Sequence, residues 1–189
     1  ACVLAAIGAL ATFTPRLPTV LDPAARAGAR VGRFLADALP PGTLVATATA
    51  GSTPYYAPEL SFVDTLGLND RRIARRDPVP MEARWQRVPG HLKGDGPYVL
   101  ERAPDVVILG PAQGYIGKPA RGWFLTDFEL VTNPTFHARY APYNFTVRDV
   151  PESPLDLVLY LRQDSPAARN LIRLGTPAVP PRTYVPNGP

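Results

Sequence analysis

The stretch 98-YVLERAPDVVILG-110 decides the fold class that the sequence predicts. Its first half has the composition of a brief helical turn, and residues 106–109 form an unbroken apolar run between Asp105 and Gly110. A short continuous apolar run with such borders is typical of a strand that is covered on both faces of a sheet. We therefore expect this segment to be a central strand of an α/β protein.

The segments before this strand add a helix, two strands and a second helix. Asp22 as N-cap, Pro23 at the first helical position and the stop at residues 40–42 predict an amphipathic helix. Strands are expected within 43-TLVATATA-50 and 60-LSFVDTLGL-68, and a short helix within 69-NDRRIARR-76, capped by Asn69 or Asp70. This order of elements favours strands that are at least partly parallel.

The second half of the chain has a different pattern. The segments 128-FELVTNPTF-136, 143-YNFTVRDV-150 and 155-LDLVLYLRQ-163 alternate between apolar and polar residues and are joined by short polar turns. Such alternation is typical of antiparallel strands. The sequence therefore predicts a small mixed sheet, with a parallel N-terminal part, an antiparallel C-terminal part and helices packed on it.

The length of 189 residues suits one folded domain, which we place at residues 22–174. The tail 175–189 is rich in proline, so we expect it to be extended or disordered. Residues 1–13, ACVLAAIGALATF, are almost entirely apolar and are followed by a linker at residues 14–21. We interpret this run as the end of a transmembrane helix that begins outside the chain; a buried helix of a soluble protein is the alternative.

Composition and charge disfavour several classes of function. The net charge is +4, but the arginines are scattered among acids, whereas nucleic-acid binders concentrate positive charge on one face. A mild positive charge is compatible with anionic lipid headgroups. One cysteine and two distant histidines predict no metal site, and no cofactor is expected in this chain. No P-loop or GxSxG motif is present, and we interpret the glycine-rich segment 110–122 as a flexible surface loop.

Three polar and aromatic clusters are candidates for a binding site. They lie in 52-STPYYAPEL-60, 64-DTLGLND-70 and 90-GHLKGDG-96. Because ligands of open α/β sheets gather at the carboxyl ends of strands, these clusters can face one crevice. Aromatic rings with carboxylates and amides are typical of sugar recognition. The alternative is that each residue only packs, caps a helix or holds a loop. The candidate binding residues are Tyr55, Tyr56, Asp64, Asn69, Asp70, His91 and Lys93.

The runs 55-YYAPELSFVDTLGLNDRRIAR-75 and 90-GHLKGDGPYVLERAPDVVILG-110 resemble the C-terminal extramembrane domain of bacterial polytopic membrane glycosyltransferases of the GT-C type. Those enzymes use sugars carried on polyprenyl phosphate. The resemblance rests on a DxLGLxDxxIA segment beginning at Asp64, on GHxK at residues 90–93, and on the pair Pro104-Asp105 before a strand. It covers about the middle third of the chain.

The resemblance implies a domain without catalytic residues of its own, on the extracytoplasmic side of the cell membrane. In that family the catalytic aspartates lie in a loop of the membrane domain, outside this chain. The domain would then bind a glycan or a lipid-linked sugar, with His91 and Lys93 as donors to a phosphate or to acceptor hydroxyls. The alternatives are a free-standing carbohydrate-binding or adaptor domain and a small hydrolase that uses His91.

Overall fold

The computed structural model describes residues 22–77, 79, 91–117, 122–148 and 153–178. Its described part contains one six-stranded sheet in the order β2-β1-β3-β5-β4-β6. The strands are β1 (Leu44–Thr47), β2 (Ser61–Asp64), β3 (Val106–Val107), β4 (Tyr140–Val147), β5 (Leu155–Arg162) and β6 (Thr176–Pro177). The helices are α2 (Pro23–Ala38), α3 (Ser52–Tyr55), α4 (Arg71–Arg75), α5 (Gly96–Arg102), α6 (Leu125–Val131), α7 (Pro134–Arg139) and α8 (Arg169–Leu174).

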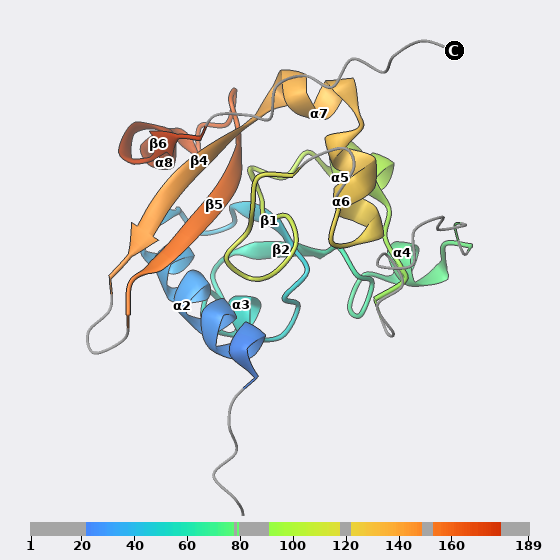
Figure 1. Cartoon of the computed structure of the whole chain (residues 1–189), viewed down its shortest axis with the longest axis horizontal. Helices are drawn as coiled ribbons and strands as arrows, with labels where there is room; N and C mark the ends of the chain where they lie inside the picture. The colour runs from blue at the N-terminus through green and yellow to red at the C-terminus, as the bar shows by residue number, and fades with distance from the viewer. Residues whose placement is uncertain (1–21, 78, 80–90, 118–121, 149–152, 179–189) are drawn as a thin grey trace, which may run out of the picture.

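The sheet changes direction between its two halves. β1 pairs in parallel with β2 and with β3, whereas β3 with β5, β5 with β4, and β4 with β6 pair antiparallel. Figure 1 shows the long β4–β5 hairpin standing beside the shorter parallel strands. The predicted fold class, a mixed α/β sheet with a parallel N-terminal and an antiparallel C-terminal part, is confirmed.

Helices cover both faces of the sheet, because neighbouring residues of the central strands belong to different cores. Val106 and Ile108 pack in the cluster that contains Val31 of α2, whereas Val107 and Leu109 pack with residues of α5 and α6. Burial on both faces explains why the sequence of this strand is apolar without alternation. The central position expected for it is confirmed.

The first helix begins as the sequence predicts. The Asp22 side chain accepts a hydrogen bond from the Ala24 amide at 2.8 Å, and Pro23 occupies the first helical position. Two glycines of α2 then allow α3 to approach closely: a Cβ on Gly28 would lie 2.1 Å from Ser52 Oγ, and one on Gly32 would lie 2.5 Å from the Thr53 carbonyl oxygen. The middle of α2 is therefore packed closely against the segment that follows β1.

The strand expected within residues 128–136 is wrong, because this segment is helical. It contains the end of α6 and the start of α7. The Asn133 side chain accepts a hydrogen bond from the Thr135 amide at 2.9 Å, and Pro134 is the first residue of α7. Local N-cap chemistry therefore overrides the apparent alternation of apolar residues.

The glycine-rich segment after β3 is more closely packed than a flexible surface loop. The Val158 amide donates to the Gln113 carbonyl oxygen at 2.8 Å, and the Gly117 amide donates to the Tyr160 hydroxyl at 3.0 Å. Gly114 has a φ of +70°, and a Cβ there would lie 2.0 Å from the Val158 carbonyl oxygen. In residues 110–117 the glycines thus allow the backbone to lie directly against β5.

The described part of the chain begins at residue 22 and ends at residue 178. β6 pairs with β4, so the sheet extends to residue 177, past the expected domain end at residue 174. The apolar run 1–13, the linker 14–21 and most of the proline-rich tail lie outside the described residues. Among the described helices, none is long and apolar enough to span a bilayer.

Candidate functional site

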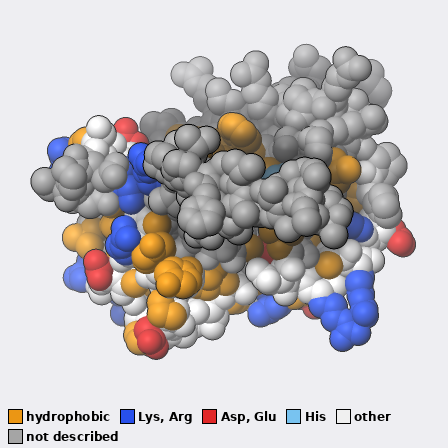
Figure 2. Space-filling model, turned by 90° about the horizontal axis from the view of Figure 1, so that it is seen from below, with side chains coloured by type: hydrophobic (Ala, Val, Ile, Leu, Met, Phe, Trp, Pro, Cys, Tyr) orange, Lys and Arg blue, Asp and Glu red, His pale blue; other side chains and the backbone are white. Residues whose placement is uncertain are grey.

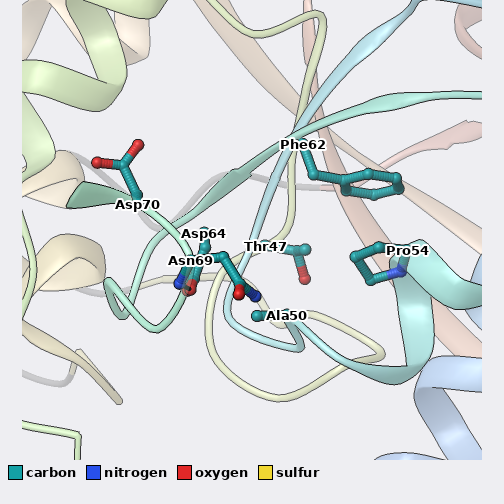
Figure 3. A pocket seen from close by; sticks show the side chains of 7 residues that line it. All are labelled: Thr47, Ala50, Pro54, Phe62, Asp64, Asn69 and Asp70. Carbon is teal, nitrogen blue, oxygen red and sulfur yellow. Dashed lines mark hydrogen bonds between the residues drawn. The ribbon is translucent and has the colours of Figure 1, made fainter. Parts of the chain in front are cut away.

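The candidate site is a small pocket at the carboxyl ends of β1 and β2. These strands are parallel neighbours, with Thr47 in register with Asp64, so the loops that follow them leave the sheet side by side. The pocket has a volume of about 180 Å³. It is lined by Thr47, Ala50, Pro54, Phe62, Asp64, Asn69 and Asp70. Figure 3 shows Asp64, Asn69 and Thr47 close together, with Phe62 and Pro54 beside them and Asp70 further away.

Asp64 organises the loop after β2 from inside. Its side chain is 5% exposed, and its two oxygens accept hydrogen bonds from the Leu66 amide at 2.9 Å and the Asn69 amide at 2.5 Å. A buried carboxylate bonded to two backbone amides fixes the path of a loop. The last residue of β2 therefore positions Asn69 at the pocket.

Asn69 places at the pocket a side-chain amide that forms no hydrogen bond within the described residues. The residue is exposed, and its side-chain amide has no hydrogen-bond partner among the described residues. An amide can donate and accept at the same time, so it can pair with a hydroxyl in either direction. Asn69 is thus the pocket residue best placed to bind a polar ligand.

Thr47 gives the pocket a second polar group, and Phe62 gives it an apolar surface. The Thr47 hydroxyl lies 2.9 Å from the Thr49 hydroxyl, which in turn lies 2.7 Å from the Thr53 hydroxyl. The Phe62 ring is half-buried and lies near Pro54 (Figure 3). The pocket therefore has the Thr47 hydroxyl at the end of β1 and an apolar ring on the neighbouring strand β2.

Asp70 lines the pocket, but its carboxylate is already hydrogen-bonded to the helix that follows it. One oxygen accepts hydrogen bonds from the Arg72 and Ile73 amides at 2.9 and 3.1 Å, and so caps α4. The other accepts one from the Tyr98 hydroxyl at 3.1 Å. The prediction that Asn69 or Asp70 caps this helix is resolved in favour of Asp70.

The two tyrosines lie beside the pocket and do not line it. Tyr55 is 76% exposed, and its ring meets that of Tyr56 edge to face at 5.0 Å between centroids. The Arg33 guanidinium lies over the Tyr56 ring, 4.3 Å from its centroid. Tyr56 is therefore engaged by α2, and Tyr55 is the ring that is open to a partner.

The loop that carries His91 and Lys93 reaches the same edge of the sheet but does not line the pocket. Lys93 Nζ donates to the Arg76 carbonyl oxygen at 2.5 Å. The Arg76 guanidinium forms a two-pronged ion pair with Glu129, with distances of 2.7 and 2.8 Å, and donates to the Gly94 carbonyl oxygen at 2.7 Å. Hydrogen bonding to Glu129 raises the pKa of Arg76. Lys93 thus belongs to an internal clamp.

His91 and Asp95 bind this loop to neighbouring helices. The His91 ring stacks on the Phe124 ring, with 5.5 Å between centroids and 16° between planes. The Asp95 side chain caps α5 by accepting from the Tyr98 amide at 3.0 Å, and its own amide donates to Thr126 Oγ1 at 3.0 Å. The sequence clusters therefore separate into a pocket around Asn69 and a structural loop around His91.

A buried acid that the sequence did not single out lies in α6, against the segment that joins β3 to this helix. Asp127 is 2% exposed and accepts a hydrogen bond from the Phe124 amide at 3.1 Å. Burial raises its pKa to about 7, although hydrogen bonds to backbone amides act in the opposite direction. Burial also raises the pKa of the neighbouring Tyr115 hydroxyl, and the negative charge of Asp127 adds to this rise.

Four pocket residues were missed in the sequence: Thr47, Ala50, Pro54 and Phe62. Thr47 and Phe62 lie inside the predicted strands, where their alternation indicates only which face they take. The signal that could have found Thr47 is its position at the carboxyl end of β1, where ligands of parallel sheets gather. Among the described residues, no three His, Cys, Asp or Glu side chains are grouped so as to hold a metal ion.

A family model described as Domain of unknown function (DUF8728) matches residues 21–149, which is more than half of the chain. The match begins just before α2 and ends just after β4, so it includes the pocket and the His91 loop. No curated protein and no solved structure matches the chain.

Proposed function

We propose for this chain, which belongs to the DUF8728 family, the function of a carbohydrate-binding accessory domain of a membrane glycosyltransferase. In this proposal it supplies no catalytic residue and lies on the extracytoplasmic side of the cell membrane. It holds a sugar unit of the acceptor glycan or of the lipid-linked donor while the membrane domain carries out the transfer.

The observation that carries the proposal is the chemistry of the pocket. A pyranose has an apolar face and a rim of hydroxyls, and the pocket combines the Phe62 ring with the Asn69 amide and the Thr47 hydroxyl. Its volume of about 180 Å³ is below the range of roughly 300–1,000 Å³ that is usual for drug-sized ligands. A single sugar ring is therefore the ligand that we assign to it.

The non-catalytic role is supported by what the carboxylates do. Asp64 and Asp70 both line the pocket, but backbone amides occupy Asp64, and Asp70 caps a helix. Sugar hydrolysis by acid and base needs two carboxyl groups facing one bond across a gap. The pocket thus favours binding, in agreement with the resemblance to an extramembrane domain whose catalytic residues lie elsewhere.

A free-standing carbohydrate-binding or adaptor domain would use the same pocket without a membrane partner. The gene sequence upstream of Ala1 separates the two: several further hydrophobic segments favour the membrane enzyme, and a start codon directly before Ala1 favours the free-standing domain. A hydrolase using His91 receives less support, because the His91 ring stacks on Phe124 and does not line the pocket.

The test is a titration of the isotope-labelled full chain in detergent with monosaccharides, sugar phosphates and short oligosaccharides, followed by NMR. We expect saturable shifts at Thr47, Phe62 and Asn69 for at least one sugar class. Asn69→Ala should lower the affinity for that sugar about fivefold, which corresponds to the loss of roughly one hydrogen bond. Asn69 is exposed and bonds no other side chain, so the fold should be unchanged.

The matched control is Asn170→Ala, which removes the same group from α8, on the described surface away from the pocket. It should bind as the unchanged chain does. Equal effects of the two variants, or shifts that avoid the pocket for every sugar, would contradict the proposal.

A further inference from the structure

The exposed hydrophobic side chains of the described chain gather at one edge. Six large ones are exposed by more than a third, and five of these lie in α3 or in loops near the carboxyl ends of the parallel strands. They are Tyr55 at 76%, Tyr56 at 37%, Leu68 at 69%, Leu92 at 48% and Trp123 at 53%. The sixth, Leu174 at 76%, lies in α8. We name the five the apolar rim.

Hydrogen bonds and close contacts join the loops of the apolar rim into one surface. Thr126, three residues after Trp123, donates to the Thr65 carbonyl oxygen at the end of β2, at 2.9 Å. The same Thr126 hydroxyl accepts from the Asp95 amide of the loop that carries Leu92. A Cβ on Gly110, just after β3, would lie 3.1 Å from the Trp123 ring. These contacts join the segments that carry Leu68, Leu92 and Trp123, and the pocket that Pro54 and Asn69 both line connects them to α3, which ends at Tyr55.

The chain enters the domain at this same end. α2 is joined to β1 by a short turn, and its second turn packs on α3, directly after the carboxyl end of β1. Asp22 therefore lies on the rim side of the sheet. Figure 1 shows α2 beginning at the lower end of the molecule, and Figure 2, seen from that end, shows hydrophobic side chains with both basic and acidic side chains around them.

The length of the preceding segment limits how far this edge can be from a membrane. Eight residues, 14–21, separate the apolar run 1–13 from Asp22. Fully extended, they span at most roughly 30 Å, about the thickness of one bilayer core. A domain attached in this way keeps its entry end close to the lipid headgroups.

The charges around the rim suit an anionic lipid surface. Arg26 of α2 and Arg71 and Arg75 of α4 are exposed in the segments that surround it. The exposed acids at the start of α2 and after α4 are Asp22 and Asp77, whereas the exposed Asp37 and Glu59 lie toward the opposite end, before β1 and β2. Tryptophan and tyrosine prefer the headgroup region of a bilayer, and each basic side chain near an anionic surface adds attraction.

We infer that the apolar rim docks onto the membrane surface, with Trp123, Tyr55 and Leu68 inserted among anionic lipid headgroups. The docked edge holds the neighbouring pocket at headgroup height, where the sugar of a lipid-linked donor lies. This inference rests on the membrane attachment in the proposed function. It does not depend on whether the pocket binds a sugar.

The test measures where Trp123 lies when the full chain is bound to vesicles. Trp85→Phe leaves Trp123 as the single tryptophan, and vesicles of phosphatidylglycerol and phosphatidylcholine carry brominated acyl chains as the quencher. We expect Trp123 to lose much of its fluorescence. The loss should be larger with phosphatidylglycerol than in pure phosphatidylcholine, and it should shrink at high salt.

The matched control moves the tryptophan to the exposed hydrophobic residue outside the rim. In Trp85→Phe, Trp123→Phe, Leu174→Trp the probe lies on α8, and we expect it to remain unquenched on the same vesicles. Equal quenching at the two positions, or none at Trp123 while the chain stays bound, would overturn docking of the rim. A chain that does not bind vesicles would overturn the docking and the membrane attachment together.

A protein partner or a second copy on the rim would give a different result. Trp123 would then be shielded from an aqueous quencher at high protein concentration without lipid, and bromolipid would not quench it. Sugar binding in the NMR titration is measured separately, so failure of docking and failure of the pocket are distinguishable.

Discussion

The loop at residues 64–70 and the loop at residues 91–95 are similar in sequence. They differ in whether their polar side chains face a pocket or contact the rest of the domain. Each holds glycine, an acid that caps the following helix and a second polar side chain. In the first loop Asp64 holds the backbone from inside and leaves the Asn69 amide open at a pocket. In the second, Lys93 and His91 both contact the domain itself.

The difference shows that the position of a loop on the sheet decides its role. Residues 64–70 follow a parallel strand whose neighbour ends beside it, so a pocket forms between the two loops. Residues 91–95 precede a helix and cross over α6, so their polar groups meet the partners that helix ends supply. If this is correct, disturbing the second loop should lower stability and leave sugar binding unchanged.

The largest expected effect comes from Asp127 of α6, the helix that the second loop contacts through the neighbouring Thr126. Its pKa of about 7 in the folded chain is above the ordinary value of 3.8, so the folded state retains a proton that the unfolded state has already lost at pH 5. Stability is complete below the unfolded pKa and falls as the pH rises through 7. Between pH 5 and 8 we expect a loss of about 3 kcal/mol in the free energy of unfolding.

Urea denaturation at several pH values measures this loss. Asp127→Asn has no proton to release, so the part of the pH dependence that Asp127 causes should disappear in this variant. A variant with the same slope as the unchanged chain between pH 5 and 8 would show that Asp127 is ionised in the fold at neutral pH.

A smaller loss is expected from the clamp around Arg76. The Arg76 and Glu129 side chains are 26% and 17% exposed, so their ion pair lies between the buried and the exposed cases. Arg76→Ala leaves Glu129 without this partner and should lower the free energy of unfolding by about 2 kcal/mol. Pocket shifts on addition of sugar should be unchanged.

The control for Arg76 is Arg72→Ala, because Arg72 and Glu101 form an exposed pair with 57% and 65% of their side chains accessible. Its cost in denaturation experiments should be below about 1 kcal/mol. If Arg76→Ala is fully stable but no longer binds sugar, the second loop takes part in binding, and the distinction between the two loops is wrong.

The smallest effect is expected from His91. His91→Ala removes the ring that stacks on Phe124 and should cost about 1 kcal/mol. Leu92→Ala, at the exposed neighbour, is the control for loss of side-chain area in the same loop. Sugar affinity that falls in His91→Ala while stability is retained would restore His91 as a binding residue.

The sequence predicted the parallel half of the sheet better than the helices after it. Asp22-Pro23 and the apolar strand at residues 106–109 are local signals, and the structure confirms both. Asn133-Pro134 is the same cap signal as Asp22-Pro23, but apolar residues around it were interpreted as alternation, and the segment is helical. Residues 128–136 contain the end of one helix and the start of the next, so their apolar residues follow no single helical period.

The candidate site was predicted in part. The cluster Asp64, Asn69 and Asp70 lines one pocket, because the carboxyl ends of parallel strands are predictable from element order. That His91 and Lys93 face the domain depends on Glu129 and Phe124, which are over thirty residues away along the chain. No local pattern contains that information. The same holds for Asp127, whose shifted pKa comes from tertiary burial.

The glycines of α2 have a mechanical consequence. Gly28 lies against the Ser52 side chain and Gly32 against the Thr53 carbonyl group, with no side chain of α2 between them, so we expect α2 and α3 to move together. Pro54, in α3, lines the pocket. If the segment before α2 tilts this helix, α3 should tilt with it and shift Pro54 at one wall of the pocket. Pulling on that segment would then change the width of the pocket.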